Sequence, residues 1–286
     1  MASRCILIDV GNSAVKFVAY DAAAEAYLST PRSLAWRDVY DSPDSLRDFR
    51  SLCGGCEAAI VASVNRSHAS HLERLAAAAG LPRWRLVSFE DLAMRVELPR
   101  PQEVGIDRLL AASAARERMG GGEPLVVLQV GTAITVDLVD AAGSFRGGVI
   151  LPSETTLYNA LAEKTDRLPR LERRLDAADL HERTPGEEMP FATPPAEGAK
   201  LAGSGPPPGA DTVAAIRLGV ESCVRGGVLR TYRQYCEALG LEPRVAATGG
   251  GAASLAAELQ PHARLFSNLV LCGLAAVAGR GETAPL

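Results

Sequence analysis

The sequence predicts an α/β fold made of two related halves, each with a mixed central sheet and flanking helices. The first observation is an internal repeat, in which residues 6–23 (ILIDVGNSAVKFVAYDAA) match residues 126–142 (VVLQVGTAITVDLVDAA) at a shift of 120 positions. Each copy has an apolar run, a tight turn at glycine and a second β-rich run, which is the pattern of a β-hairpin. The second observation is that strand-like and helix-like segments alternate after each copy, as in α/β proteins.

Two strands and two helices are expected between the hairpins. Residues 58–64 (AAIVASV) and 85–89 (RLVSF) suit buried strands, whereas 71–80 (HLERLAAAAG) and 108–120 (RLLAASAARERMG) have helical patterns that stop at glycine. Three consecutive glycines at 120–122 indicate the boundary between the halves. We therefore predict an N-terminal half over residues 1–118 and a C-terminal half over residues 119–286.

The C-terminal half is expected to continue with a strand, three helices and a long loop. The strand is predicted at 148–152 (GVILP), and the helices at 155–168, 213–239 and 269–279. Residues 184–211 hold seven prolines and five glycines without apolar periodicity, so we expect a surface loop there.

Composition and charge exclude several classes of protein. The chain has 286 residues, of which 47% are hydrophobic, and a net charge of −4. It can bury a core, but it lacks the positive charge that broad binding to nucleic acid or anionic membranes needs. No run of 18 apolar residues occurs, and the first residues lack the pattern of a signal peptide. We expect a cytoplasmic protein with no nucleic-acid or membrane partner.

The six cysteines are scattered, as expected for small core residues in a reducing compartment. One group loosely imitates a zinc site, because Cys53 and Cys56 are followed by His68 and His71. The spacings fall short of the usual finger pattern, and a predicted strand separates the two pairs, so structural zinc is only an alternative.

The first glycine turn carries a candidate phosphate and metal site. Asp9 ends an apolar run just before Gly11-Asn12-Ser13, and Lys16 follows the turn. Glycine and small side chains let backbone N–H groups approach phosphate oxygens, and an aspartate there can hold a metal ion through water. For a single turn of this kind, the alternative is an ordinary hairpin stabilised by Asx hydrogen bonds.

A second copy and a third glycine turn favour a nucleotide site. The repeat sets Gly131-Thr132-Ala133, followed by Asp137, in the place of the first turn. Two facing turns can hold the β- and γ-phosphates of a nucleotide from both sides. Thr248-Gly249-Gly250-Gly251 follows the apolar run 244–247 and can cradle the α-phosphate or the nucleoside. A tight strand-to-helix connection is the alternative for this third turn.

A fourth motif places an aspartate next to an arginine at the start of a predicted helix. Gly105-Ile106-Asp107-Arg108 follows a proline-rich stretch and opens the helix. Asp107 can simply be the N-cap of that helix. It can also take a hydroxyl proton as general base, while Arg108 binds a substrate carboxylate through two hydrogen bonds.

Six motifs occur in one order along the chain. They are IDVGNS-x-x-K (8–16), GIDR (105–108), GTAITVD (131–137), GGVILP (147–152), KTDRLP (164–169) and TGGG (248–251). This order and spacing resemble type III pantothenate kinases, members of the acetate kinase, sugar kinase, Hsp70 and actin superfamily. The resemblance extends from Ile6 to about Leu274. It implies duplicated ribonuclease H-like (actin-like ATPase) domains.

The resemblance also implies an activity and a set of site residues. Such a kinase uses ATP to phosphorylate pantothenate to 4'-phosphopantothenate, the first step of coenzyme A biosynthesis. Asp9 would position Mg²⁺, Asp107 would be the base for the pantothenate hydroxyl, and Asp137 or Gln129 would lie near a monovalent cation, K⁺ or NH₄⁺. The implied ATP contacts are Asp9, Gly11, Asn12, Ser13, Lys16, Gly131, Thr132, Ala133, Gly249 and Gly250, and the implied pantothenate contacts are Leu98, Gly105, Arg108 and Thr165. Members of the family form homodimers in which the partner helps to close the substrate site.

Three residues depart from the family pattern. Gln129 stands where many relatives have an acid, so it can hydrogen-bond but cannot neutralise a cation. Leu98 stands where relatives often have tyrosine, which removes a hydroxyl donor worth about 1 kcal/mol. Ser153 replaces a glycine and would be strained if that turn has a positive φ.

These departures leave two alternatives to a pantothenate kinase. One is a non-catalytic paralogue that keeps the fold and has a regulatory or accessory role. The other is a kinase of the same superfamily that acts on another hydroxy acid or sugar, with Leu98 marking the altered substrate site. The four chemistry-bearing turns in one order argue against a purely structural protein.

Overall fold

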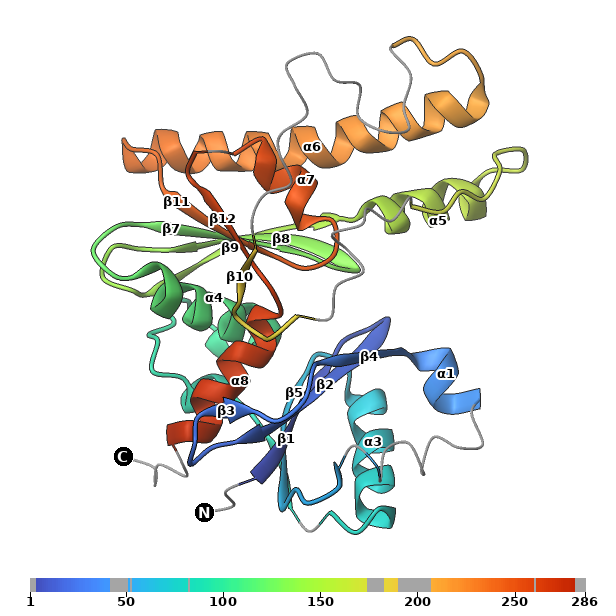
Figure 1. Cartoon of the computed structure of the whole chain (residues 1–286). Coiled ribbons are helices and arrows are strands. Elements are labelled where there is room, and N and C mark those ends of the chain that lie inside the picture. Colours follow the sequence, from blue (N-terminus) through green and yellow to red (C-terminus); the bar gives the residue numbers. More distant parts are fainter. Residues whose placement is uncertain are drawn as a thin grey trace.

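The computed structural model describes residues 4–41, 51, 53–81, 83–173, 183–189, 207–259 and 261–280. Two mixed sheets lie one above the other, with two helices between them and further helices on both outer faces (Figure 1). The chain therefore has the predicted α/β fold of duplicated ribonuclease H-like, actin-like domains.

The first sheet is built around the first predicted hairpin. Its strands are β1 (Arg4–Val10), β2 (Ala14–Asp21), β3 (Ala26–Tyr27), β4 (Arg32–Ala35), β5 (Ala58–Ser63) and β6 (Trp84–Leu86). Their order is β3-β2-β1-β5-β6, with β4 also paired to β2. β1 and β2 are antiparallel, whereas β5 and β6 continue the sheet parallel to β1.

The second sheet repeats this arrangement. Its strands are β7 (Leu125–Val130), β8 (Ala133–Val139), β9 (Phe145–Pro152), β10 (Glu188–Met189), β11 (Arg244–Thr248) and β12 (Ala263–Phe266), in the order β10-β12-β11-β7-β8-β9. The hairpin β7–β8 is again antiparallel, and β11 and β12 again run parallel to the first strand of the hairpin. Apart from β10, which pairs antiparallel with β12 and has no counterpart beside β6, the strand order and directions are the same in both sheets, which confirms the duplication that the repeated hairpin predicts.

Helices α4 (Ile106–Met119) and α8 (Leu269–Arg280) fill the space between the sheets. Their buried side chains form one core with residues of both sheets, including Leu7 of β1 and Val127 of β7. The helices approach closely at Gly273, where an added Cβ would lie only 2.5 Å from the Leu110 carbonyl oxygen. α8 comes from the C-terminal half of the chain but packs on β1 and β5 of the first sheet. The two halves therefore share one core, and the division at residue 118 stays a prediction.

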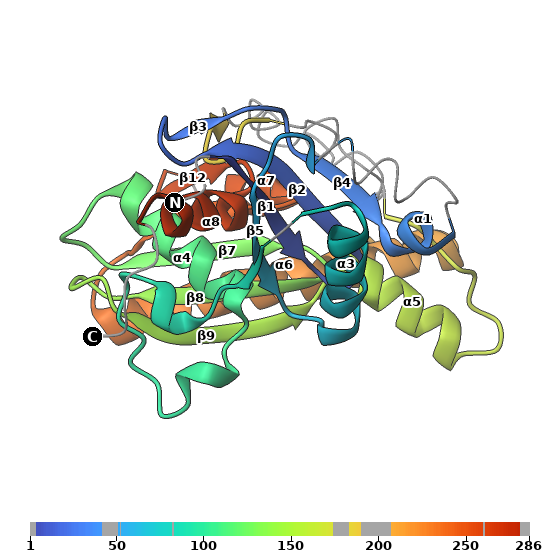
Figure 2. The same ribbon diagram turned by 90° about the horizontal axis from the view of Figure 1, so that it is seen from below.

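The outer faces carry the remaining helices. α1 (Trp36–Asp41) follows β4, and α3 (Arg66–Ala78) packs on the first sheet, as the view from below shows (Figure 2). α6 (Thr212–Leu239) and α7 (Ala252–Ala257) cover the second sheet, and α5 (Glu154–Lys164) packs along α6. α5 and the first part of α6 extend beyond the sheet as a paired arm (Figure 1). No helix among the described residues has the length and apolar character that crossing a membrane requires.

Several predicted elements need correction. The expected loop at 184–211 is wrong at Glu188–Met189, because these residues form β10 along the edge of β12; residues 190–206 lie outside the described part of the chain. The helix expected at 155–168 ends at Lys164, and the strand expected at 85–89 ends at Leu86 before a 3₁₀ turn. The short strands β3, β4 and β12 and helix α1 were not predicted, because they lack a long periodic pattern.

Candidate active site

A cleft of about 300 Å³ opens between the two halves, and all three glycine turns line it. From the first half, Asp9, Gly11, Asn12, Ser13, Lys16 and Asp107 lie on its wall. From the second half, Gln129, Gly131, Thr132, Ala133 and Gly249 lie opposite. The fold thus brings together most of the predicted site residues, which come from segments more than a hundred positions apart.

The two hairpin turns face each other directly. The Ser13 and Thr132 hydroxyl groups are hydrogen-bonded across the cleft, with their oxygens 2.8 Å apart. Each turn is closed by a backbone bond from its glycine N–H, but the two bonds differ in span. Gly11 N donates to Ala14 O, three residues on, at 3.1 Å, and Gly131 N donates to Ala133 O, two residues on, at 2.9 Å. Because the two glycine turns face each other across one cleft, the arrangement is consistent with the expectation that both hold phosphate oxygens.

The first turn has a support that the sequence did not reveal. Trp36 Nε1 of α1 donates to the Gly11 carbonyl oxygen at 2.9 Å, and Asn65 Nδ2 donates to Asn12 Oδ1 at 3.3 Å. The Trp36 ring is stacked on His68, with ring centroids 3.8 Å apart. Among the described residues no group of three or more His, Cys, Asp or Glu side chains could hold a metal ion. The stack with Trp36 connects His68 to the first turn.

The second turn is held by the start of α5. Ser153 is the N-cap of this helix, and its hydroxyl accepts from Thr156 N. The Thr156 hydroxyl in turn donates to the Thr132 carbonyl oxygen at 2.8 Å. Because Ser153 has φ −75°, the strain that a positive φ would cause is absent.

The third turn lies against the end of β7. Gly249 has φ +97°, and a Cβ there would clash with the Val130 carbonyl oxygen, so only glycine allows this approach. Thr248 is buried, and its hydroxyl accepts from Leu269 N of α8 at 3.4 Å. Gly250 follows as an exposed residue outside the cleft wall.

Two carboxyl groups face the cleft in environments that favour their neutral forms. Burial raises the pKa of Asp9 to about 6, with Lys16 opposing the shift and Asp107 adding to it. Lys16 is the cross-strand neighbour of Asp9 in the β1–β2 pair. Burial also raises the pKa of Asp107, against the lowering effect of the Arg108 N–H and side chain. Carboxylates with pKa values moved towards neutrality are typical of catalytic sites.

The start of α4 positions Asp107. Gly105, not Asp107, is the N-cap residue of this helix, so the simple capping role is not observed. Asp107 Oδ1 accepts from Arg108 N at 2.8 Å. A Cβ at Gly105 would lie 2.6 Å from the same Oδ1, so glycine leaves the space that the carboxylate occupies.

Arg108 makes a buried ion pair across the site. Its Nε lies 3.1 Å and 3.2 Å from the two carboxylate oxygens of Asp137, and its Nη2 also donates to Asp137 Oδ1. Asp137 is fully buried, and the Arg108 side chain is 14% exposed. Burial raises the pKa of Asp137, while Arg108 lowers it. The pair links α4 to β8, and neither partner was expected to contact the other.

The two candidate residues for a monovalent cation differ in their fit. Asp137 does not fit, because the Arg108 guanidinium already neutralises it. Gln129 Oε1 is buried without a hydrogen-bond partner among the described residues, and Gln129 lines the cleft. A neutral amide oxygen of this kind is a chemically suitable but weak ligand for K⁺.

Comparison with known proteins decides the family. The family model described as type III pantothenate kinase matches residues 5–193. A type III pantothenate kinase of Rhodopirellula baltica is 39% identical over 269 residues, covering 87% of this chain and 88% of its own. The chain belongs to the type III pantothenate kinase family.

More distant proteins span the chain as well. A type III pantothenate kinase of Acidovorax ebreus is 29% identical and covers 96% of both chains. Among solved structures, the activator of 2-hydroxyisocaproyl-CoA dehydratase from Clostridium difficile covers 100% of this chain and 99% of its own, at 12% identity and a TM-score of 0.48.

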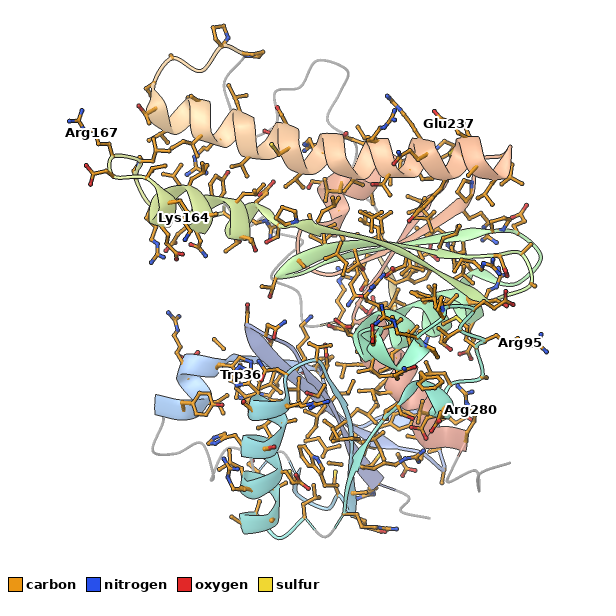
Figure 3. The ribbon with its side chains drawn as sticks, turned by 180° about the vertical axis from the view of Figure 1, so that it is seen from behind. Trp36, Arg95, Lys164, Arg167, Glu237 and Arg280 are labelled. Carbon is orange, nitrogen blue, oxygen red and sulfur yellow. The ribbon has the colours of Figure 1, made fainter. Side chains whose placement is uncertain are left out.

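Six predicted site residues are not among those that line the cleft, namely Leu98, Gly105, Arg108, Asp137, Thr165 and Gly250. Leu98 is half-buried and packs over Gly147, where an added Cβ would lie 3.3 Å from Leu98 Cδ2. Thr165 is exposed after the end of α5, and its hydroxyl donates to Leu161 O at 2.7 Å. Lys164 and Arg167 mark this end of α5 at the tip of the arm (Figure 3). Within one chain, therefore, Thr165 does not reach the cleft.

Proposed function

We propose that this protein transfers the γ-phosphoryl group of ATP to pantothenate, giving 4'-phosphopantothenate for coenzyme A biosynthesis. One observation carries the proposal. A single cleft contains two facing glycine turns and a half-buried carboxyl group, Asp107, whose pKa is raised. Family membership supplies the acceptor, and we expect the enzyme to act in the cytoplasm.

The cleft provides what an in-line transfer to a hydroxyl needs, which is positioning and charge neutralisation. We infer that Gly11, Asn12 and Ser13 bind the phosphates from one side and Gly131, Thr132 and Ala133 from the other. Lys16 supplies a positive charge beside the first turn. Gly249 and Gly250 lie at the end of the site where the nucleoside of ATP binds. Asp107 then accepts the proton of the attacking hydroxyl.

The donor set at Asp9 fits a magnesium ion bound together with ATP. Mg²⁺ is usually held by one or two carboxylates plus phosphate oxygens. Asp9 lines the cleft, and burial raises its pKa to about 6, so a bound cation would stabilise its ionised form. When bound, Mg²⁺ neutralises negative charge on the phosphates.

Pantothenate recognition is proposed to involve Gly105, Arg108 and Leu98. Two nitrogens of Arg108 donate to Asp137, which fixes the plane of the guanidinium and orients it towards a substrate carboxylate. Thr165 directly follows Lys164, which Figure 3 shows on the arm, and it is not among the residues that line the cleft of its own chain. We therefore propose a homodimer in which the arm of one subunit brings Thr165 to the cleft of the other.

The test is release of ADP from ATP and Mg²⁺, with and without pantothenate. We expect release to require pantothenate, and mass spectrometry to detect phosphopantothenate. Release with another hydroxy acid or a sugar, but not with pantothenate, would show that the acceptor is wrong. A folded protein that binds ATP and releases no ADP with any acceptor would be the non-catalytic paralogue.

A monovalent cation, K⁺ or NH₄⁺, is proposed to bind at Gln129 rather than at Asp137. Because the amide oxygen is neutral, we expect K⁺ to activate turnover only at a high concentration. Gln129→Asp should lower the K⁺ concentration needed for half-maximal turnover, because a carboxylate attracts the cation more strongly. K⁺ titrations at constant ionic strength, with Na⁺ as the replacement ion, measure this.

The matched control for this titration is Gln102→Asp, a change at an exposed position outside the cleft. We expect it to leave the K⁺ response at the wild-type level. If Gln129→Asp also has no effect on the K⁺ concentration required, then Gln129 is not the cation ligand.

A further inference from the structure

One residue holds two carbonyl groups of the first glycine turn. Trp36 lies at the start of α1 (Figure 3). Its indole Nε1 donates to the Gly11 carbonyl oxygen at 2.9 Å, and its backbone N–H donates to the Ser13 carbonyl oxygen at 3.3 Å. The two bonds come from a single residue, so Trp36 sets the orientation of the peptide groups that follow Gly11 and Ser13.

The position of Trp36 is itself fixed by its surroundings. The residue is 6% exposed and belongs to the same core as Val10 and Val15, which flank the turn. The His68 ring of α3 stacks on the indole, with ring centroids 3.8 Å apart and an angle of 9° between the planes. His68 Nδ1 is in turn hydrogen-bonded to the Tyr40 hydroxyl at 2.8 Å. Because the core and the stacked ring hold the indole, its N–H has a fixed direction.

The indole also fixes the direction of one backbone N–H group. The peptide group between Gly11 and Asn12 is trans, and in a planar trans peptide the C=O and the N–H point in opposite directions. Trp36 holds the Gly11 C=O on the side of α1, so the Asn12 N–H points to the other side. Asn12 lines the cleft, whereas Trp36 is not among the lining residues. We therefore infer that the Asn12 N–H faces the cleft.

This N–H group is available to a ligand. Within the part of the chain that the structure describes, no group accepts a hydrogen bond from Asn12 N. The Asn12 side chain is held separately, because its Oδ1 accepts from Asn65 Nδ2 at 3.3 Å. Asn65 is the N-cap of α3, the helix that carries His68. Since backbone N–H groups in tight turns bind phosphate oxygens, the turn offers a donor whose direction is set before the nucleotide arrives.

The Trp36 bond is not simply what any buried indole in this chain makes. Trp84 packs against the same core, and its Nε1 is buried without a hydrogen-bond partner among the described residues. A tryptophan can therefore fill this core without its N–H reaching a carbonyl group. The bond from Trp36 to Gly11 is a particular feature of the turn.

We propose that Trp36 is a positioning residue for nucleotide binding, whose indole orients the Gly11–Asn12 peptide so that the Asn12 N–H donates to a phosphate oxygen of ATP. This rests on the proposed use of the cleft for ATP. Trp36 does not touch the nucleotide. It removes the cost of orienting the peptide group on binding, as preorganised sites do.

The experiment measures ADP binding in the presence of Mg²⁺ by isothermal titration calorimetry. Trp36→Phe keeps an aromatic ring to stack on His68 and removes the N–H donor. We expect it to weaken ADP binding about threefold to tenfold, the affinity that one hydrogen bond is worth. In steady-state kinetics KM for ATP should rise, with KM for pantothenate unchanged.

The matched control is Trp84→Phe, the same change at the other of the two tryptophans. It removes an indole N–H that has no partner among the described residues, so ADP affinity should stay at the wild-type value. It also leaves Trp36 as the only tryptophan, and adding ADP with Mg²⁺ should then change the fluorescence of the indole that contacts the turn. In Trp36→Phe the remaining Trp84 should not respond.

The outcomes separate this inference from the proposed function. If Trp36→Phe binds ADP as tightly as wild type but melts at a lower temperature, Trp36 only packs in the core, and the inference is wrong. If Trp36→Phe does not fold, the fluorescence of Trp84→Phe decides, and emission from Trp36 that ADP leaves unchanged overturns the inference. If wild type does not bind ADP at all, the proposed use of the cleft fails, and the inference fails with it.

Discussion

Replacing Asp107 with asparagine is expected to lower kcat for pantothenate phosphorylation by about 10²- to 10⁴-fold, the range that a general base contributes. The amide has nearly the same shape, and its oxygen can still accept from Arg108 N, the contact that measures 2.8 Å in the native protein. It cannot take the proton of the attacking hydroxyl. Coupled measurement of ADP release gives kcat, and calorimetry with ADP shows that the nucleotide site is intact.

The control for this substitution is Asp38→Asn. The Asp38 carboxylate is exposed on α1 and lies 3.4 Å from Arg37, outside the cleft. Its replacement removes the same charge from the protein without touching the site, so kcat should not change. A wild-type kcat in Asp107→Asn would remove Asp107 from the role of base.

The pH dependence of the wild-type enzyme provides a second measure of the same role. A general base works when ionised, so kcat should fall as pH drops through the pKa of Asp107. Because burial raises that pKa, the fall should begin at a higher pH than for an exposed aspartate. Asp107→Asn should lose this acidic limb, and what activity remains should be flat over the same range.

The raised pKa values also have a consequence for the stability of the nucleotide-free protein. The pKa of Asp9 rises from 3.8 to about 6 on folding, so the folded state holds this proton more tightly than the unfolded state. The resulting stabilisation is fully present below pH 3.8 and is lost as pH rises through about 6. At neutral pH the empty cleft therefore carries an energetic cost, which bound Mg²⁺ and ATP relieve.

The duplicated fold could be predicted because its signals are local and repeated. Each hairpin has its own turn and its own apolar strands, and the shift of 120 residues shows that the two belong to the same kind of unit. The position of α8 could not be predicted in this way. Its sequence is apolar on most sides, which indicates burial but not which sheet it packs against.

The site was predictable to the extent that its residues lie in the turns themselves. Glycine turns at strand ends are visible in a sequence, and the fold brings them together. Pairings between distant residues were not predictable: Arg108 with Asp137, and Trp36 with Gly11, depend on how α4 and α1 pack.

The buried pair between Arg108 and Asp137 leads to the largest expected effect on stability. Arg108→Met should lower the free energy of unfolding by about 3–5 kcal/mol, because it leaves a fully buried carboxyl group without its partner. Urea denaturation followed by circular dichroism measures this. Arg100→Met is the matched control. Arg100 pairs with Glu103 at 2.9 Å while 71% exposed, and loss of such a surface pair costs only about 0–1 kcal/mol.

A second variant separates the loss of the partner from the loss of packing. In Arg108→Met with Asp137→Leu, both charges of the pair are gone, so no buried charge is left without its partner. Replacing a buried ion pair by apolar side chains is often neutral or stabilising, so the double variant should recover most of the loss. If it is as unstable as Arg108→Met, the arginine contributes through packing over Phe145 rather than through the carboxylate.

The pH dependence of Arg108→Met gives the sign of the electrostatic contribution. Burial already raises the pKa of Asp137, and Arg108 is the main group that lowers it. Without Arg108 the pKa of Asp137 rises further, so the folded variant takes up a proton that the unfolded chain releases more readily. Stability from that protonated form is present at low pH and is lost as pH rises. The difference in unfolding free energy between wild type and Arg108→Met should therefore shrink towards acid pH and widen towards alkaline pH.

A difference that is constant across pH would show that Asp137 is not the group whose charge Arg108 balances. In that case the pair would not be what fixes the first turn of α4, where Asp107 lies.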